Sequence, residues 1–199
     1  MAAKIKSFVV GELQSNSYLL AGRYLIDAGG LSGELKEALL ACRDSFEAVL
    51  LTHAHVDHIA GILEIKQLLP ECKVYCHRSE KKFLADPKLN LSVWLGKEIS
   101  VEADGTFDEY SPAIEGEKLQ VIETPGHTPG GVCFYWQSEG LLFSGDTLFK
   151  NGVGRTDLYG GDMGTLQNSI KSKLFTLPVG TTVFPGHGPQ TIIGDEVSG

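Results

Sequence analysis

Side chains that could bind metal ions are concentrated at a few places in this chain. The densest group has four of them within six residues: His53, His55, Asp57 and His58. Three more follow later in the sequence: His127, Asp146 and His187. Imidazole and carboxylate groups are typical ligands of zinc, iron and manganese. Seven such ligands are too many for one tetrahedral site, and they suit two metal ions that share one carboxylate and leave room for a water molecule.

The elements expected to position these residues are strands that end just before them. The sequence predicts such strands at four places: Ala48–Leu51, Leu119–Thr124, Leu141–Ser144 and Thr181–Phe184. Ligands gather where the carboxyl ends of strands converge at one edge of a sheet. His53 and His55 are two residues apart, so an extended backbone directs both rings the same way. Asp57 and His58 follow as the chain bends into a helix.

The remaining elements alternate between strands and helices in both halves of the chain. Further strands are expected at Ile5–Val10, Asn16–Ala21, Arg23–Asp27, Lys73–Cys76 and Gly131–Trp136. Helices are expected at 35–42, His58–Leu69, Ser79–Ala85 and 166–174, with a loop or flap over 86–118. This order predicts an α+β fold, an αββα sandwich of two mixed β-sheets flanked by helices.

Composition limits the possible partners. The chain has 199 residues and a net charge of −8, which argues against a nucleic-acid partner because phosphate binding needs a basic face. Its apolar runs are too short for a membrane span or a signal peptide. The four cysteines show no metal-binding spacing and are expected to be free thiols in a reducing cytoplasm: Cys42, Cys72, Cys76 and Cys133.

A structural interpretation of the histidines is the main alternative to a catalytic metal site. A single histidine in a loop is usually solvated, but that reading does not suit four donors within six residues. A closed structural zinc site uses four ligands, often cysteines, and leaves no open position. The set therefore favours a reactive centre.

Four ordered segments resemble one known family. Residues Thr52–Gly61 read T-H-A-H-V-D-H-I-A-G and resemble the T-H-x-H-x-D-H signature of the metallo-β-lactamase superfamily. The later segments 126–130, 144–146 and 185–188 resemble that family in the same order. The resemblance implies one metal ion bound by three histidines: His53, His55 and His127. It implies a second ion bound by Asp57, His58 and His187, and it makes Asp146 the bridging ligand.

Within that superfamily, the chain most resembles short glyoxalase II-like thioester hydrolases. True β-lactamases often have cysteine or serine where this chain has Asp146, and the glyoxalase II-like proteins also contain Gly-Arg-x-Asp, here Gly154–Asp157. The resemblance implies hydrolysis of S-lactoylglutathione-like thioesters by a metal-bound hydroxide, which Asp57 orients and whose proton it accepts. Two divalent ions are implied, with zinc expected and iron or manganese as alternatives. Only twelve residues follow His187, so we expect a single domain over 1–199 without the C-terminal helical domain that binds glutathione.

Three further residues are expected to support the site or contact the substrate. Asp27 either holds a metal ligand from behind or caps a turn. Arg155 and Asp157 either form a pair beside the ligands or make a plain surface ion pair, and the third possibility is that Arg155 binds an anionic substrate group. The expected partner is a small-molecule thioester, with no nucleic acid and no membrane.

Three other functions are alternatives to thioester hydrolysis. Persulfide dioxygenases share the histidine motif and a Gly-Arg-Thr-Asp segment, but they bind one iron and consume oxygen. Their last histidine is usually followed by an acidic and aromatic pair, whereas His187 precedes Gly188 and Pro189. Hydrolysis of other esters or lactones is a second alternative, and a metal-binding module without turnover is a third.

Overall fold

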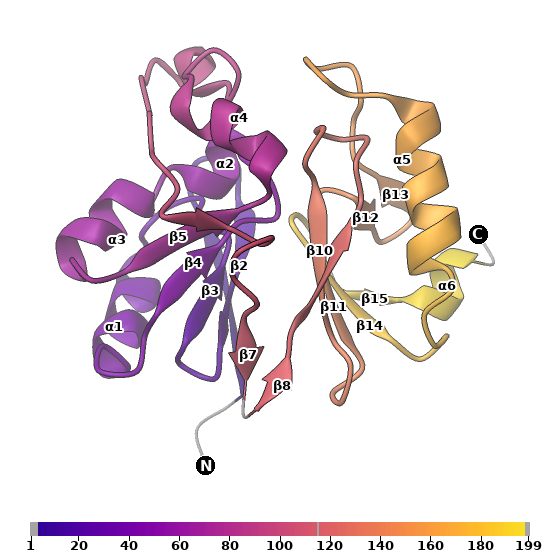
Figure 1. The fold of residues 1–199 in the computed structure, drawn as a ribbon, viewed down its shortest axis with the longest axis horizontal. Helices are drawn as coiled ribbons and strands as arrows, with labels where there is room; N and C mark the ends of the chain where they lie inside the picture. Colours follow the sequence, from indigo (N-terminus) through magenta and orange to yellow (C-terminus); the bar gives the residue numbers. More distant parts are fainter. Residues whose placement is uncertain (1–3, 115, 198–199) are drawn as a thin grey trace. The chain divides into compact units, whose positions relative to one another are not determined.

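The chain folds into two compact units, residues 1–110 (unit 1) and 111–199 (unit 2). The structure is a computed structural model, and it describes residues 4–114 and 116–197. Each unit is built on its own mixed β-sheet with helices packed against it (Figure 1).

Unit 1 contains a six-stranded sheet whose strands follow chain order. They are β1 (Ile5–Val10), β2 (Ser15–Leu20), β3 (Tyr24–Ile26), β4 (Ala48–Leu50), β5 (Lys73–Cys76) and β6 (Gly105–Thr106). The first three strands pair in antiparallel fashion, whereas β3 to β6 are parallel. Because β3 and β4 run in the same direction, the loops that follow them begin at the same edge of the sheet.

The helices of unit 1 bury apolar side chains against this sheet. They are α1 (Gly33–Ala41), α2 (Val56–Ile59), α3 (Ile62–Leu68), η1 (Arg78–Glu80), α4 (Lys81–Ala85) and η2 (Ser92–Leu95). Helix α1 begins at Ser32, whose side chain accepts a hydrogen bond from the backbone N–H of Leu35 at 3.2 Å. Leu35, Leu39, Ile62 and Ile65 are fully buried in the same core as the strand residue Val49.

The prediction of a single helix over His58–Leu69 was wrong. The chain forms two helices, α2 and α3, with a break at residues 60–61. The backbone N–H of Gly61 donates to the carbonyl of Ala28 at 2.8 Å. A Cβ atom at Gly61 would lie 2.6 Å from the carbonyl carbon of Gly30. The break therefore allows the start of the helical segment to dock closely on the loop after β3.

The segment after α4 is also more ordered than the expected loop or flap. Within unit 1, the buried Asn90 side chain donates to the carbonyl of Ile99 at 2.8 Å and accepts from the N–H of Ser92 at 3.0 Å. Residues 102–109, which are rich in Asp and Glu, contain β6, which pairs with β5. These contacts fix an irregular segment to the body of the unit.

Unit 2 contains a five-stranded sheet in the order β15-β14-β11-β10-β9. Its strands are β9 (Gln120–Glu123), β10 (Val132–Trp136), β11 (Leu141–Gly145), β14 (Thr182–Pro185) and β15 (Thr191–Ile192). Only β11 and β14 are parallel among the described strands of this sheet, so Gly145 and Pro185 end at the same edge. Two small ribbons accompany it: β7 (Ala113–Ile114) with β8 (Glu117–Lys118), and β12 (Leu148–Phe149) with β13 (Gly152–Val153).

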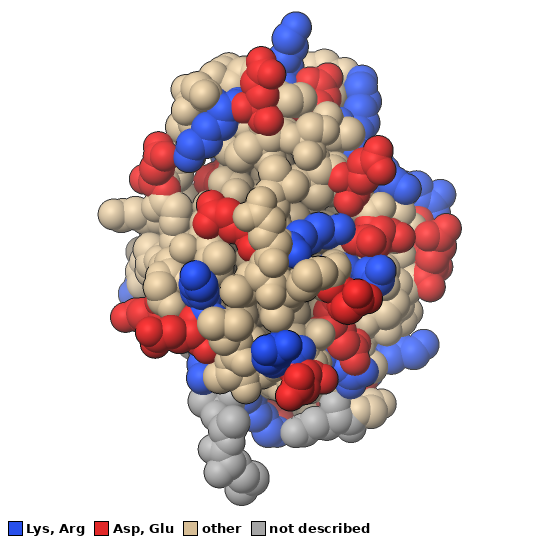
Figure 2. All heavy atoms as spheres, turned by 90° about the vertical axis from the view of Figure 1, so that its left-hand side faces the viewer, with Lys and Arg blue, Asp and Glu red and all other residues tan. Residues whose placement is uncertain are grey.

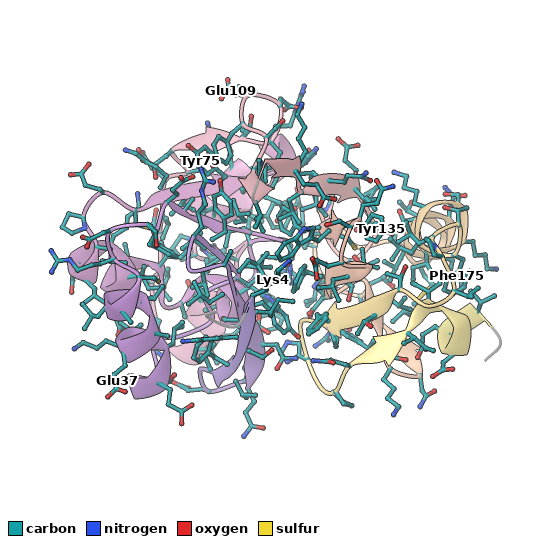
Figure 3. All side chains as sticks on the ribbon, turned by 90° about the horizontal axis from the view of Figure 1, so that it is seen from below. Lys4, Glu37, Tyr75, Glu109, Tyr135 and Phe175 are labelled. Carbon is teal, nitrogen blue, oxygen red and sulfur yellow. The ribbon has the colours of Figure 1, made fainter. Side chains whose placement is uncertain are left out.

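The helices of unit 2 are α5 (Met163–Ser169), the π-helix η3 (Ile170–Leu174) and α6 (Ile193–Val197). Leu166 and Leu174 are fully buried in the core of this unit. Tyr135 of β10 belongs to the same core, and Phe175 packs against it (Figure 3). The sequence did not predict β12, β13, β15 or α6, all of which have five residues or fewer.

The helical face of unit 1 carries charges of both signs. In the view of Figure 2, Lys and Arg side chains are interspersed with Asp and Glu side chains over the side that holds α1 and α3. That face offers no broad basic patch. Within residues 4–114 and 116–197, no helix combines the length and apolar character that a membrane span requires.

Candidate metal centre

Unit 1 brings four of the predicted ligands together in the loop after β4 and in α2. His53, His55 and His58 are buried, and the Asp57 side chain is 17% exposed. The ring centroid of His53 lies 4.9 Å from that of His55 and 4.2 Å from that of His58. Nε2 of His58 is 3.6 Å from a carboxylate oxygen of Asp57. Ligand atoms of His53 and His55 lie within 4.8 Å of one another, as do those of Asp57 and His58.

Asp27 lies behind these histidines, at the end of β3. It is 2% exposed, and its backbone has a φ of +55°, a conformation that a non-glycine residue adopts at a cost. One oxygen of its carboxylate, Oδ2, is 2.8 Å from Nδ1 of His58. The other, Oδ1, accepts the backbone N–H of Thr52 at 2.8 Å. Asp27 was expected either to hold a metal ligand from behind or to cap a turn. Its side chain contacts the predicted ligand His58, as the first of these roles requires.

Thr52 extends this arrangement to His53. Its hydroxyl donates to Oδ2 of Asp27 at 2.7 Å and lies 3.1 Å from Nδ1 of His53. Since the hydroxyl proton is used toward Asp27, the hydroxyl oxygen accepts from Nδ1–H of His53. A neutral imidazole that donates through Nδ1 has its lone pair on Nε2. One buried carboxylate therefore orients two histidine rings and selects the tautomer of each.

Glu80 is a site-supporting residue that sequence reasoning missed. It lies at the end of η1 and is fully buried. Its Oε2 accepts the backbone N–H of Ala54 at 2.9 Å, between the two histidines of the loop. The only local signal was an acidic residue in the charged run Ser79–Lys82, which resembles an exposed helix surface.

Glycines after β3 let the backbone around Asp57 approach closely. A Cβ atom at Gly29 would lie 1.9 Å from the carbonyl oxygen of Asp57 and 2.0 Å from the Ser15 hydroxyl. That hydroxyl donates to the Asp57 carbonyl. Only glycine leaves room for this contact, which fixes the first turn of α2.

Unit 2 brings the other three predicted ligands together. His127 follows β9, Asp146 follows β11 and His187 follows β14. Oδ2 of Asp146 is 3.8 Å from Nε2 of His127 and 3.8 Å from Nε2 of His187. A carboxylate placed equally far from two imidazole nitrogens suits a ligand shared by two ions.

His127 is oriented by the backbone of Arg155. Its Nδ1 lies 2.7 Å from the Arg155 carbonyl oxygen. A carbonyl only accepts hydrogen bonds, so Nδ1 of His127 carries the hydrogen and Nε2 carries the lone pair. Gly154 makes this approach possible, because a Cβ there would lie 1.9 Å from the Asp146 carbonyl oxygen and 3.2 Å from Nδ1 of His127.

The side chains of Arg155 and Asp157 face solvent and bind each other. Nε and Nη2 of Arg155 each donate to Asp157 at 2.7 Å, and the two side chains are 59% and 67% exposed. The hydrogen bonds from Arg155 lower the pKa of Asp157 to about 2. The Arg155 contact to a predicted ligand is thus made by its carbonyl, and the side-chain pair is a surface ion pair. The sixth histidine, His77, caps η1 by accepting from the N–H of Ser79 at 3.2 Å.

The donor chemistry fits divalent metal ions. The seven side chains are imidazoles and carboxylates, which zinc, iron and manganese accept. His53, His58 and His127 each have Nδ1 against an oxygen, and metal-binding histidines are typically held through the ring nitrogen that does not bind the metal. The rings are therefore prepared to bind through Nε2.

Comparison with known proteins places the chain in a family. The model of the metallo-beta-lactamase superfamily matches residues 10–187. This chain belongs to the metallo-β-lactamase superfamily. Its relatives include the "Probable metallo-hydrolase YqgX" of Bacillus subtilis, with 39% identity over 97% of this chain and 94% of that protein. They also include "Hydroxyacylglutathione hydrolase GloC" of Haemophilus influenzae, with 31% identity over 86% and 82%.

Two solved structures have a similar fold. BLEG-1, described as a B3 metallo-beta-lactamase, is 40% identical, with a TM-score of 0.86 over 98% of this chain and 97% of that chain. TTHA1623, solved in a di-iron-bound form, is 35% identical, with a TM-score of 0.77 over 96% of both chains. The predicted metallo-β-lactamase fold, with mixed sheets and flanking helices, is confirmed, and so is the prediction of a metallo-hydrolase of this superfamily.

Proposed function

We propose that this chain is a metal-dependent hydrolase of thioesters, with S-lactoylglutathione as the first substrate to test. The observation that carries the proposal is the position of Asp146, whose carboxylate oxygen lies 3.8 Å from both His127 and His187. A carboxylate in this position, rather than cysteine or serine, is the feature that separates the chain from many β-lactamases. The similarity to GloC, a protein named as a hydroxyacylglutathione hydrolase, supports the same substrate class.

In this proposal two divalent ions are bound by the seven ligands, as the family motifs imply. His53, His55 and His127 would hold one ion, Asp57, His58 and His187 would hold the other, and Asp146 would contribute a ligand to each. When bound, the ions lower the pKa of a water molecule and polarise the substrate carbonyl. Zinc is the metal we propose, with iron as the first alternative because TTHA1623 is similar to this chain and holds two irons.

The protein's own residues hold the site in shape and move the proton. Asp57 orients the attacking water and accepts its proton, and its backbone is fixed by Ser15. Asp27 and Thr52 hold the rings of His53 and His58, so the ligands need little rearrangement before metal binding. The thiol product has a low pKa, so it can leave as the thiolate, and thioester cleavage requires no strong general acid. The partner in this proposal is a small molecule, with neither nucleic acid nor membrane, which agrees with the net charge of −8.

The test is to load the metal-free protein separately with zinc, manganese and iron, and to measure thiol release from S-lactoylglutathione. We expect release that stops when a chelator is added. Asp146→Ala and His55→Ala should lose bound metal and activity together, and full activity in either metal-depleted variant would contradict the ligand assignment.

The same preparations separate the other candidate reactions. Well-metallated protein that releases no thiol from S-lactoylglutathione would reject the glyoxalase II-type substrate. Oxygen uptake by the iron-loaded protein with glutathione persulfide would then favour the dioxygenase alternative. Turnover of a chromogenic cephalosporin, included because BLEG-1 is named a β-lactamase, would favour lactam hydrolysis, and lactones and other esters would be tried next.

A further inference from the structure

A cavity of about 360 Å³ lies in unit 1 beside the predicted ligand Asp57. It is bounded by the turn after β1, the loop after β3, the helix α2 and the end of η2. Asp57 and Val56 form part of its wall, so the cavity lies next to the residue that is proposed to orient the attacking water. Its volume is within the range of small-molecule sites.

Apolar side chains supply much of the remaining wall. They come from separate elements of unit 1: Val10, Leu13, Leu31, Ala60 and Leu95. Two apolar residues of the wall are also exposed to solvent, Val9 at 65% and Leu13 at 49%, and Trp94, which precedes the wall residue Leu95, is 67% exposed. Exposed apolar side chains that gather around a cavity favour binding of an apolar group.

The charges on the wall argue against an anionic occupant. The cavity is lined by three carboxylates, Glu12, Asp57 and Glu64, and by one ammonium group, Lys97. Lys97 is already paired with Glu12 at 2.8 Å. Lys97 is therefore already engaged, so an occupant with carboxylates of its own, such as the glutathione part of a thioester, would gain no unpaired cation on this wall and would face Glu64. An uncharged aliphatic occupant needs no such cation.

We propose that this cavity binds the acyl chain of the substrate and selects uncharged aliphatic acyl groups longer than the three-carbon lactoyl group. The inference rests on the proposed thioester hydrolysis, since it assigns the acyl side of that substrate. The thiol part of the substrate then lies outside the cavity, so the protein tolerates different thiols. Preference for the acyl group is set by Leu13, Leu31 and Leu95.

The first experiment varies only the acyl chain. Acetyl, butyryl, hexanoyl and octanoyl thioesters of N-acetylcysteamine have the same small, neutral thiol. With the metal-loaded protein, kcat/KM should rise by up to about fourfold for each added methylene until the cavity is filled, as expected for burial of aliphatic surface. A flat profile, in a protein that does hydrolyse S-lactoylglutathione, would overturn the cavity assignment and leave the proposed function standing.

The second experiment makes the side chain of one wall residue larger in one variant and smaller in another. Leu95→Trp should fill the cavity and lower kcat/KM for the hexanoyl thioester at least tenfold, with the acetyl thioester changed less than twofold. Leu95→Ala should shift the preference toward the octanoyl thioester. Leu63→Trp is the matched control, because Leu63 is 44% exposed on α3 and is not part of the cavity wall. Equal losses for all chain lengths in Leu95→Trp, with no shift in Leu95→Ala, would contradict the proposal.

Binding to the metal-free protein gives a readout that does not need turnover. By calorimetry, the thioether S-hexyl-N-acetylcysteamine should bind at least tenfold more tightly than the S-ethyl compound. Equal binding of the two thioethers would overturn the assignment of the cavity to the acyl chain, even if the protein hydrolysed none of the thioesters. If Lys97→Ala instead raises KM for S-lactoylglutathione and leaves the hexanoyl series unchanged, the cavity holds the anionic thiol part and our assignment is wrong.

Discussion

The carboxylate of Asp27 lies 2.8 Å from Nδ1 of His58, and both side chains are almost completely buried. The same carboxylate accepts the backbone N–H and the hydroxyl of Thr52, which in turn contacts His53. Two predicted ligands therefore depend on one acidic residue that is itself no predicted ligand. This arrangement explains why the chain maintains a positive φ at residue 27.

Asp27→Asn should weaken metal binding by about 10-fold to 100-fold, because an amide cannot accept from Nδ1–H of His58 and from Thr52 with the strength of a carboxylate. Zinc affinity would be measured by competition with a chromogenic chelator. Asp104→Asn is the matched control, since Asp104 accepts a backbone N–H from Val74 in the same unit and contacts no predicted ligand. Unchanged zinc affinity in Asp27→Asn would show that the contact does not support the ligands.

Glu80 should support the His53–His55 loop through the N–H of Ala54. Glu80→Ala leaves that buried N–H without its acceptor, which costs about 1–3 kcal/mol of stability, and we expect at least tenfold weaker zinc binding. Glu80→Gln retains an acceptor oxygen and should restore part of the zinc affinity. Glu37→Gln on the outer side of α1 (Figure 3) is the control. If the alanine and glutamine variants bound zinc equally well, the hydrogen bond would have no role in positioning the loop.

Gly154 offers a sharp comparison with a neighbouring glycine. Gly154→Ala would place a Cβ 1.9 Å from the Asp146 carbonyl oxygen, whereas a Cβ at Gly152 meets nothing within 4 Å. The backbone at Asp146 must shift in the first variant, so we expect a loss of about 2 kcal/mol or more and reduced metal content. Gly152→Ala should stay within about 0.5 kcal/mol of the parent. Chemical denaturation and metal analysis of both variants test this, and equal behaviour would contradict it.

The positions of several predicted ligands could be read from the sequence because they follow short apolar strands. The strands before His53, Asp146 and His187 are buried and short, and parallel pairing brings strand ends to one edge within each unit. The alternation of strands and helices was sufficient for the fold class. Elements of two residues, such as β12 and β13, leave no periodic pattern to detect.

The partners of the supporting residues could not be read in this way because these contacts join residues far apart in the chain. Glu80 reaches Ala54 across 26 positions, and Asp27 reaches His58 across 31. The Arg155 contact was hidden for another reason, since the carbonyl contacts His127 while the side chain faces solvent. The break between α2 and α3 depends on the close approach of Gly61 to Gly30, which no local pattern indicates.

Glu47 should make the stability of unit 1 sensitive to acid. Burial alone raises the pKa of its carboxyl, but hydrogen bonds from Arg23 at 2.6 Å and from Tyr24 at 2.9 Å bring that pKa below its ordinary value. A folded-state pKa below the unfolded-state value contributes stability above the unfolded-state pKa, and this contribution is lost as the pH falls through the folded-state pKa. Because the side chain is 40% exposed, we expect only about 1 kcal/mol. Urea unfolding of the metal-free protein should show that Glu47→Gln has a free energy of unfolding lower than the parent's by that amount at pH 7, and that this difference disappears below pH 4. The control Glu37→Gln should match the parent at both pH values. If the difference for Glu47→Gln persisted undiminished in acid, the ionised carboxylate would not be its source.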